Sequence, residues 1–88
     1  MLSAVDIQRI KERINSLDDE ALIEETRQLR ASAEGVPPKL AARWDELIGE
    51  AVGQLTSILT IGRIGRRKEA RGRLRGFCIE RHKALGQE

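Results

Sequence analysis

Apolar residues recur along the chain at the three- and four-residue spacings of amphipathic helices. Ile7, Ile10 and Ile14 form one narrow apolar seam, which Leu17 extends by another turn. Ser3 stands three residues before Asp6, a spacing typical of an N-terminal capping box. The pattern therefore predicts a first helix over about residues 3–16.

A second helix is predicted over residues 17–34. Its apolar face is formed by Leu22, Thr26, Leu29 and Ala33. Ser16 is the expected N-cap, and the acidic run 18–20 that follows it complements the positive end of the helix dipole. Gly35 and the Pro37-Pro38 pair predict that the helix ends before residue 35.

The strongest helical period of the chain follows, and it predicts one long central helix over residues 37–60. Its apolar positions are Leu40, Trp44, Leu47, Ile48, Ala51, Leu55, Ile58 and Leu59. Small residues, including Gly49 and Gly53, share a second face of this helix. That face is interpreted either as a partner surface or as a place of close packing against the first or second helix.

A last helix is predicted over residues 66–85, after a bend at residues 60–65. Its apolar residues are Ala70, Leu74, Phe77, Cys78 and Leu85, and Gly72 and Gly76 weaken it. No segment alternates as a strand does. The predicted fold is all-α, a single domain over residues 1–88 that forms a bundle or hairpin of three to four helices.

We also expect a homodimer, because 88 residues supply a thin core and the helix over 37–60 has two usable faces. The residues expected at the dimer or partner interface are Trp44, Gly49, Gly53, Leu55 and Ile58. For Trp44 the alternative is a position in, or at the edge of, the core.

The net charge of +2 hides a strong division along the chain. Residues 1–60 carry 7 basic and 11 acidic side chains, whereas residues 61–88 carry 9 basic and 3 acidic ones. Such asymmetry is typical of a chain with an anionic partner, or of one whose halves pair internally.

The basic segment is the main candidate site, with seven cations between residues 63 and 75. The residues expected to bind nucleic acid or an acidic partner are Arg63, Arg66, Arg67, Lys68, Arg71 and Arg75. On a helix, Lys68, Arg71 and Arg75 align into a ridge that suits phosphate groups. The alternative is that the acidic stretch 18–25 neutralises this ridge within the molecule.

A helix-turn-helix made from the last two predicted helices is a further possibility, since the segment between them contains glycine. Residues 61–86 contain no Asn or Gln to read base edges, so contacts to the phosphate backbone are expected instead. With two aromatic residues in the chain, stacking on single-stranded bases is not expected.

Other classes of protein are disfavoured. Cys78 is the only cysteine, so there is no internal disulfide, and a reducing, cytoplasmic setting is expected. The longest uncharged stretch, residues 51–62, is too short and too polar for a membrane span. Cys78 and His82 lie one turn apart but lack further His or Cys ligands, so no metal and no cofactor are expected.

The sequence therefore predicts a small regulatory protein, not an enzyme, that binds nucleic acid through its Arg-rich C-terminal helix. No phosphate loop, nucleophile motif or carboxylate pair points to catalysis or to a small-molecule substrate. The alternative is an inhibitor or antiactivator that docks on an acidic or hydrophobic surface of a partner protein through the same helix and the apolar helix faces.

Overall fold

A computed structural model describes residues 2–57 and 64–86. These residues form four helices and no strand: α1 (Ala4–Asn15), α2 (Asp19–Ala31), α3 (Pro38–Thr56) and α4 (Ile64–Gly86). The prediction of an all-α fold is confirmed.

The first two helices begin where local hydrogen bonds dictate. The Ser3 hydroxyl accepts from the Asp6 amide at 3.1 Å, and the Asp6 carboxylate accepts from the Ser3 amide, which completes the predicted capping box. Asp18, not Ser16, caps α2, because its carboxylate accepts from the Ala21 amide at 2.8 Å. Ser16 instead ends α1, where its amide donates to the carbonyl of Glu12.

The later boundaries differ from the predicted ones by a few residues. Helix α2 ends at Ala31, and Gly35 lies in the following loop with a φ of 72°, a conformation that favours glycine. Pro38 then occupies the first turn of α3, as predicted. Helix α3 ends at Thr56 and α4 begins at Ile64, so most of the predicted bend at residues 60–65 lies outside the described residues.

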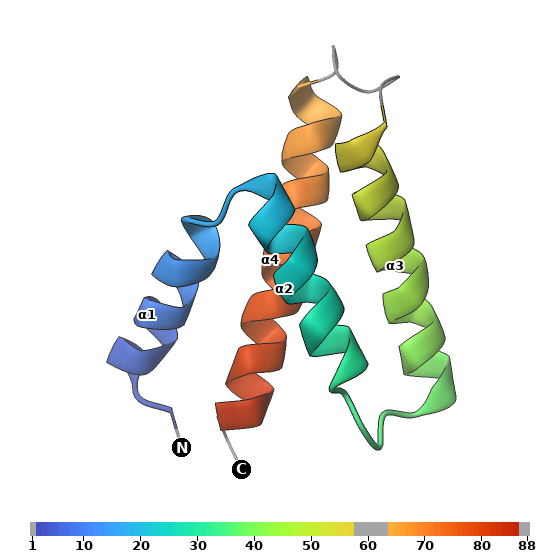
Figure 1. Ribbon diagram of the computed structural model, residues 1–88. Helices are drawn as coiled ribbons and strands as arrows, with labels where there is room; N and C mark the ends of the chain where they lie inside the picture. The colour runs from blue at the N-terminus through green and yellow to red at the C-terminus, as the bar shows by residue number, and fades with distance from the viewer. Residues whose placement is uncertain (1, 58–63, 87–88) are drawn as a thin grey trace.

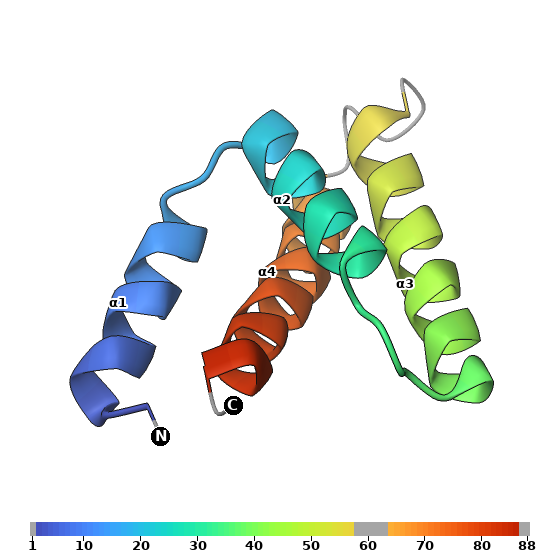
Figure 2. The same ribbon diagram turned by 60° about the horizontal axis from the view of Figure 1, so that its bottom comes forward.

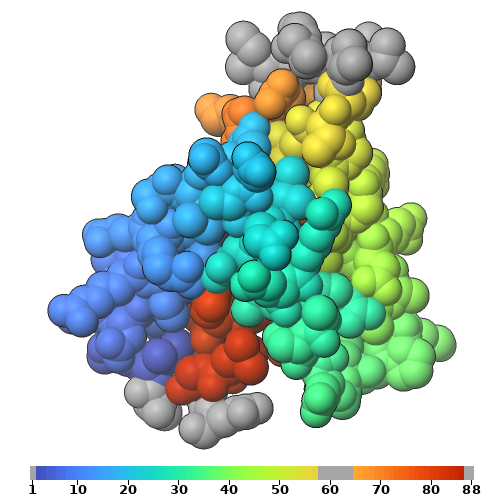
Figure 3. Space-filling model, viewed as in Figure 1, coloured from blue at the N-terminus to red at the C-terminus, as the bar shows by residue number. Residues whose placement is uncertain are grey.

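Helix α4 is the centre of the fold (Figures 1 and 2). It contacts α1, α2 and α3, and its 23 residues exceed the 19 of α3. In Figure 1, α2 lies in front of α4, while α1 and α3 flank it, and the space-filling view of Figure 3 shows that these helices cover most of α4 on this face. This corrects the expectation that the helix over 37–60 is the long central one. Gly72 and Gly76 led us to expect a weak last helix. The packing of three helices around α4 outweighs its low intrinsic helix stability.

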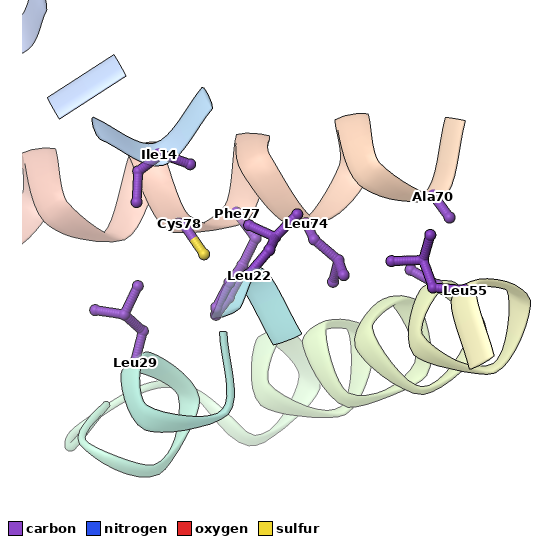
Figure 4. Packing of buried hydrophobic residues seen from close by; sticks show 9 residues of the cluster. Ile14, Leu22, Leu29, Leu55, Ala70, Leu74, Phe77 and Cys78 are labelled. Atoms are coloured by element: carbon purple, nitrogen blue, oxygen red, sulfur yellow. The ribbon is translucent and has the colours of Figure 1, made fainter. Parts of the chain in front are cut away.

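The core is small and is dominated by α4. Four of its nine buried apolar residues come from this helix; the nine are Ile14, Leu22, Leu29, Ala51, Leu55, Ala70, Leu74, Phe77 and Cys78. Figure 4 shows these side chains between α4 and its neighbours. The principal extents of 42 × 31 × 17 Å describe a thin slab, since a helix with its side chains is about 10–12 Å across.

One polar side chain is buried in this core. The Thr26 hydroxyl donates to the Leu22 carbonyl at 2.8 Å and lies 3.2 Å from the Cys78 sulfur. Its hydrogen-bonding capacity is thus met within α2, which is why threonine is tolerated here. Cys78 has no exposed surface and is a core residue, as its place on the apolar stripe indicated, and this burial raises the pKa of its thiol.

Across the part of the chain that the structure describes, no helix combines the length and the apolar character that a membrane span requires.

Candidate anion-binding surface on the C-terminal helix

Helix α4 carries eight basic side chains against two acidic ones. Its core-facing side holds Ala70, Leu74, Phe77 and Cys78. Because α1, α2 and α3 occupy only that side and its flanks, the basic residues are divided between contacts with these helices and solvent. Their partners decide which of them are available to bind an anion.

Two of the predicted binding residues are engaged by α2. The Asp19 carboxylate accepts from Nε and Nη2 of Arg71 at 2.5 and 3.0 Å, and from Nη2 of Arg67 at 3.1 Å. The expectation of an uninterrupted ridge is therefore corrected at Arg71, which is paired internally. Asp19 reaches both guanidinium groups because Arg67 and Arg71 are one turn apart and face the first turn of α2.

Three other predicted residues have no ion pair among the described residues. Arg66 and Lys68 are exposed, and Arg75 is half-buried, with its Nε enclosed and unpartnered in the described part of the chain. Arg63 lies outside the described residues. Lys68, Arg71 and Arg75 together line one side of a shallow groove of about 580 Å³, whose other side is formed by residues 17–20.

The remaining cations of α4 contact other side chains of the chain. Arg73 lies 3.9 Å from a Glu50 oxygen, and Lys83 lies 3.4 Å from Glu80. The Arg81 guanidinium stacks over Trp44 at 5.0 Å from the ring centroid. Trp44 in turn meets Phe77 edge to face, with the ring centroids 5.3 Å apart.

A second charged cluster joins α1, α2 and α4. One oxygen of Glu25 lies 3.0 Å from Nη2 of Arg13 and 2.7 Å from Nε2 of His82. Nη2 of Arg13 also lies 2.9 Å from Nε2 of His82, so that ring nitrogen either accepts from Arg13 or donates to Glu25, depending on the tautomer. The sequence analysis did not predict this role of His82. The local pattern gives no sign of a contact with Glu25, which is 57 positions away, or with Arg13, which is 69 positions away.

These pairs shift the pKa values of the carboxylates downward. Hydrogen bonds from Arg71, and to a lesser degree from Arg67, lower the pKa of Asp19. At Glu25 burial opposes ionisation, yet hydrogen bonds from His82 and Arg13 outweigh it, and the pKa is lowered. Arg30 likewise lowers the pKa of Asp45 in a bond of 2.6 Å that joins α2 to α3.

We expect the protein to lose stability in acid for this reason. A carboxyl group whose pKa is lowered by folding stabilises the folded state above its unfolded pKa, near 3.8 for Asp and 4.5 for Glu. That contribution fades as the pH falls from about 5 through the folded pKa values. Urea unfolding midpoints measured between neutral and acidic pH test this. A Glu25→Gln variant should show a shallower decline, and an unchanged midpoint across this range would contradict the assignment.

The last two helices do not form a helix-turn-helix. Helices α3 and α4 run in opposite directions side by side in both views (Figures 1 and 2). A DNA-reading pair instead crosses at about 90–120°. The long apolar face of α3, which packs along α4, explains the difference.

The predicted interface residues of α3 divide into two groups. Leu55 is buried in the chain's own core, and Trp44 is half-buried against the same cluster, which agrees with the alternative of a position at the edge of the core. Gly49 and Gly53 are exposed, and a Cβ atom added to either would meet nothing within 4 Å. Among residues 2–57 and 64–86, therefore, no helix packs closely against these glycines. Ile58 lies outside the described residues.

Among residues 2–57 and 64–86, no group of three or more His, Cys, Asp or Glu side chains is placed to hold a metal ion. Cys78 is buried beside Thr26, whereas His82 faces Glu25, so the two residues serve different contacts.

Comparison of the chain with family models, with curated proteins and with solved structures gave no match.

Proposed function

We propose that this chain is a small, non-enzymatic regulatory protein that binds double-stranded nucleic acid through the solvent-facing side of α4. The observation that carries the proposal is that Arg66, Lys68 and Arg75 have no ion pair among the described residues. Cations of this kind neutralise phosphates and release counterions, which favours binding to a duplex.

The shape of the helix supports contact with a phosphate backbone. Gly72 and Gly76 are exposed on α4 beside Lys68 and Arg75, and a Cβ added at either glycine would meet nothing within 4 Å. A phosphodiester strand is thereby able to approach the helix backbone closely. Lys68 and Arg75, seven residues apart, are separated by about 10 Å along the helix axis.

The aromatic residues support a duplex over a single strand. Phe77 is buried, and Trp44 is half-buried and contacts both Phe77 and Arg81. These are the only aromatic residues of the chain, so no exposed ring offers a stacking platform for unpaired bases.

We expect the triple variant Arg66→Ala, Lys68→Ala and Arg75→Ala to bind a duplex more weakly and with less dependence on salt. Each lost phosphate contact reduces the slope of log K against log salt concentration by about 0.9, so the three together reduce it by roughly 2.7. Fluorescence anisotropy of a labelled DNA duplex, at several chloride concentrations, measures this slope.

The matched control removes three exposed cations from other helices, Arg9, Lys11 and Lys39, at the same cost in net charge. Its slope should stay close to that of the unmodified protein. If the salt slope fell equally in both variants, the effect would be due to net charge alone, and the assignment of the site to α4 would be wrong. No binding to DNA or RNA duplexes at low salt would refute the proposal.

A second candidate function is association with a protein through α3, and the first such partner we propose is another copy of this chain. The exposure of Gly49 and Gly53 supports it, because glycine in a helix costs about 1 kcal/mol relative to alanine, and packing within the chain does not require it. The thin core also favours burial of further surface. Sedimentation velocity at micromolar concentration tests the dimer, and a monomer mass throughout would refute it.

A further inference from the structure

The Asp19 carboxylate occupies a site built for an oxyanion. It receives three N–H groups from two arginines, two of them from the fork of Arg71 and one from Arg67. Two arginines one turn apart that converge on a single carboxylate present the donor arrangement with which proteins bind phosphate.

The two arginines lie near cations of α4 that have no ion pair in the part of the chain that the structure describes. Lys68 and Arg75 line the same groove as Arg71, and Asp19 lies on its opposite side together with Asp18 and Glu20. The side chains of Asp19, Arg67 and Arg71 keep 29, 25 and 31% of their surface exposed. Solvent, and therefore a competing anion, reaches this ion pair, unlike a buried one.

We propose that Asp19 competes with nucleic-acid phosphate for Arg67 and Arg71. On binding, a phosphate group displaces the Asp19 carboxylate and is bound by both arginines. This inference rests on the function proposed above. In the free protein, Asp19 holds two of the arginines of the basic segment in place and neutralises part of their charge. In the complex, a backbone phosphate receives the same donors, and binding is weakened by the free energy of breaking the ion pairs with Asp19.

The test compares Asp19→Asn with Glu20→Gln. Both substitutions remove one negative charge from the same side of the groove, but only the first releases arginines, since Glu20 is exposed and has no ion pair among the described residues. We expect Asp19→Asn to bind a DNA duplex about tenfold more tightly than Glu20→Gln does. Its salt slope should equal that of the unmodified protein, because the same phosphates are contacted in both complexes.

A second pair of variants leaves Asp19 intact and so guards against a change in the folding of α2. Arg67→Gln with Arg71→Gln should weaken duplex binding and flatten the salt slope by about 1.8, the value for two phosphate contacts. Arg27→Gln with Arg43→Gln removes two exposed arginines from α2 and α3 and should leave the slope nearly unchanged. Circular dichroism confirms that each variant is helical.

The outcomes distinguish a failure of this inference from a failure of the proposed function. If the unmodified protein binds the duplex and Asp19→Asn binds no more tightly than Glu20→Gln, the competitor role is overturned and the proposed function stands. If no variant binds a duplex, both are overturned. If Asp19→Asn binds inorganic phosphate more tightly than the unmodified protein does, yet binds the duplex no more tightly than Glu20→Gln does, the two arginines form a site for a free phosphate, and the assignment to nucleic acid fails.

Discussion

Leu74→Ala should remove about 2–5 kcal/mol from the free energy of unfolding, the range for truncating a buried leucine. Leu74 has no exposed surface, and it points from the central helix into the cluster that includes Leu22 and Phe77 (Figure 4). The slab is too thin for neighbouring side chains to close the cavity from a second layer. Small single-core domains rarely have more than about 3–5 kcal/mol from their core, so the variant should be largely unfolded near body temperature.

Urea denaturation followed by circular dichroism measures the loss. The control is Leu85→Ala on the same helix, where 43% of the side chain is exposed. Its effect should stay within about 0.5–1 kcal/mol. Similar losses at the two positions would contradict the placement of the core on α4.

Replacing both exposed glycines of α3 should have the opposite effect. Gly49→Ala with Gly53→Ala should stabilise the monomer by about 1–2 kcal/mol, because each alanine favours the helix and its methyl group enters open space. For a domain of this size, each kcal/mol raises the melting temperature by roughly 4–8 °C. Lower stability at high dilution would mean that the glycines are packed against another part of the chain.

The same variant separates folding from association. If the small-residue face of α3 is a dimer interface, two methyl groups keep the helices apart, and the dimer should dissociate at higher concentrations. Gly72→Ala with Gly76→Ala is the matched control, since these glycines lie equally open on α4. It should give the same rise in melting temperature without a change in association. Equal dimer affinity in all three proteins would exclude α3 as the interface.

Local rules predicted the parts of the fold that depend on neighbouring residues. The capping box at Ser3 and the burial of Cys78 follow from spacing alone. The predicted face of α2 is confirmed at Leu22, Thr26 and Leu29, whereas Ala33 lies beyond the end of the helix and is half-buried. The N-cap of α2 was misassigned because Ser16 and Asp18 are both good caps, and hydrogen bonding at the end of α1 decided between them.

Contacts between distant segments were beyond the reach of these rules. The sequence left open whether the acidic residues of 18–25 contact the basic segment, because such contacts depend on how α2 packs on α4. The structure divides the arginines: Arg67 and Arg71 bind Asp19, whereas Arg66 has no ion pair in the described part of the chain. The central place of α4 was also not predictable from local rules. Arg81 interrupts the apolar side of this helix, and only its stacking on Trp44, a residue of α3, accommodates it there.

The place of α4 at the end of the described chain has a consequence for the order of folding. Helix α1 packs mainly on α4, and the contact of 2.9 Å between Arg13 and His82 joins residues 69 positions apart. Such contacts form only after a long loop has closed, which slows folding relative to bundles with local contacts. During synthesis, therefore, α1 leaves the ribosome long before α4 does, and it can pack on α4 only after that helix has been synthesised.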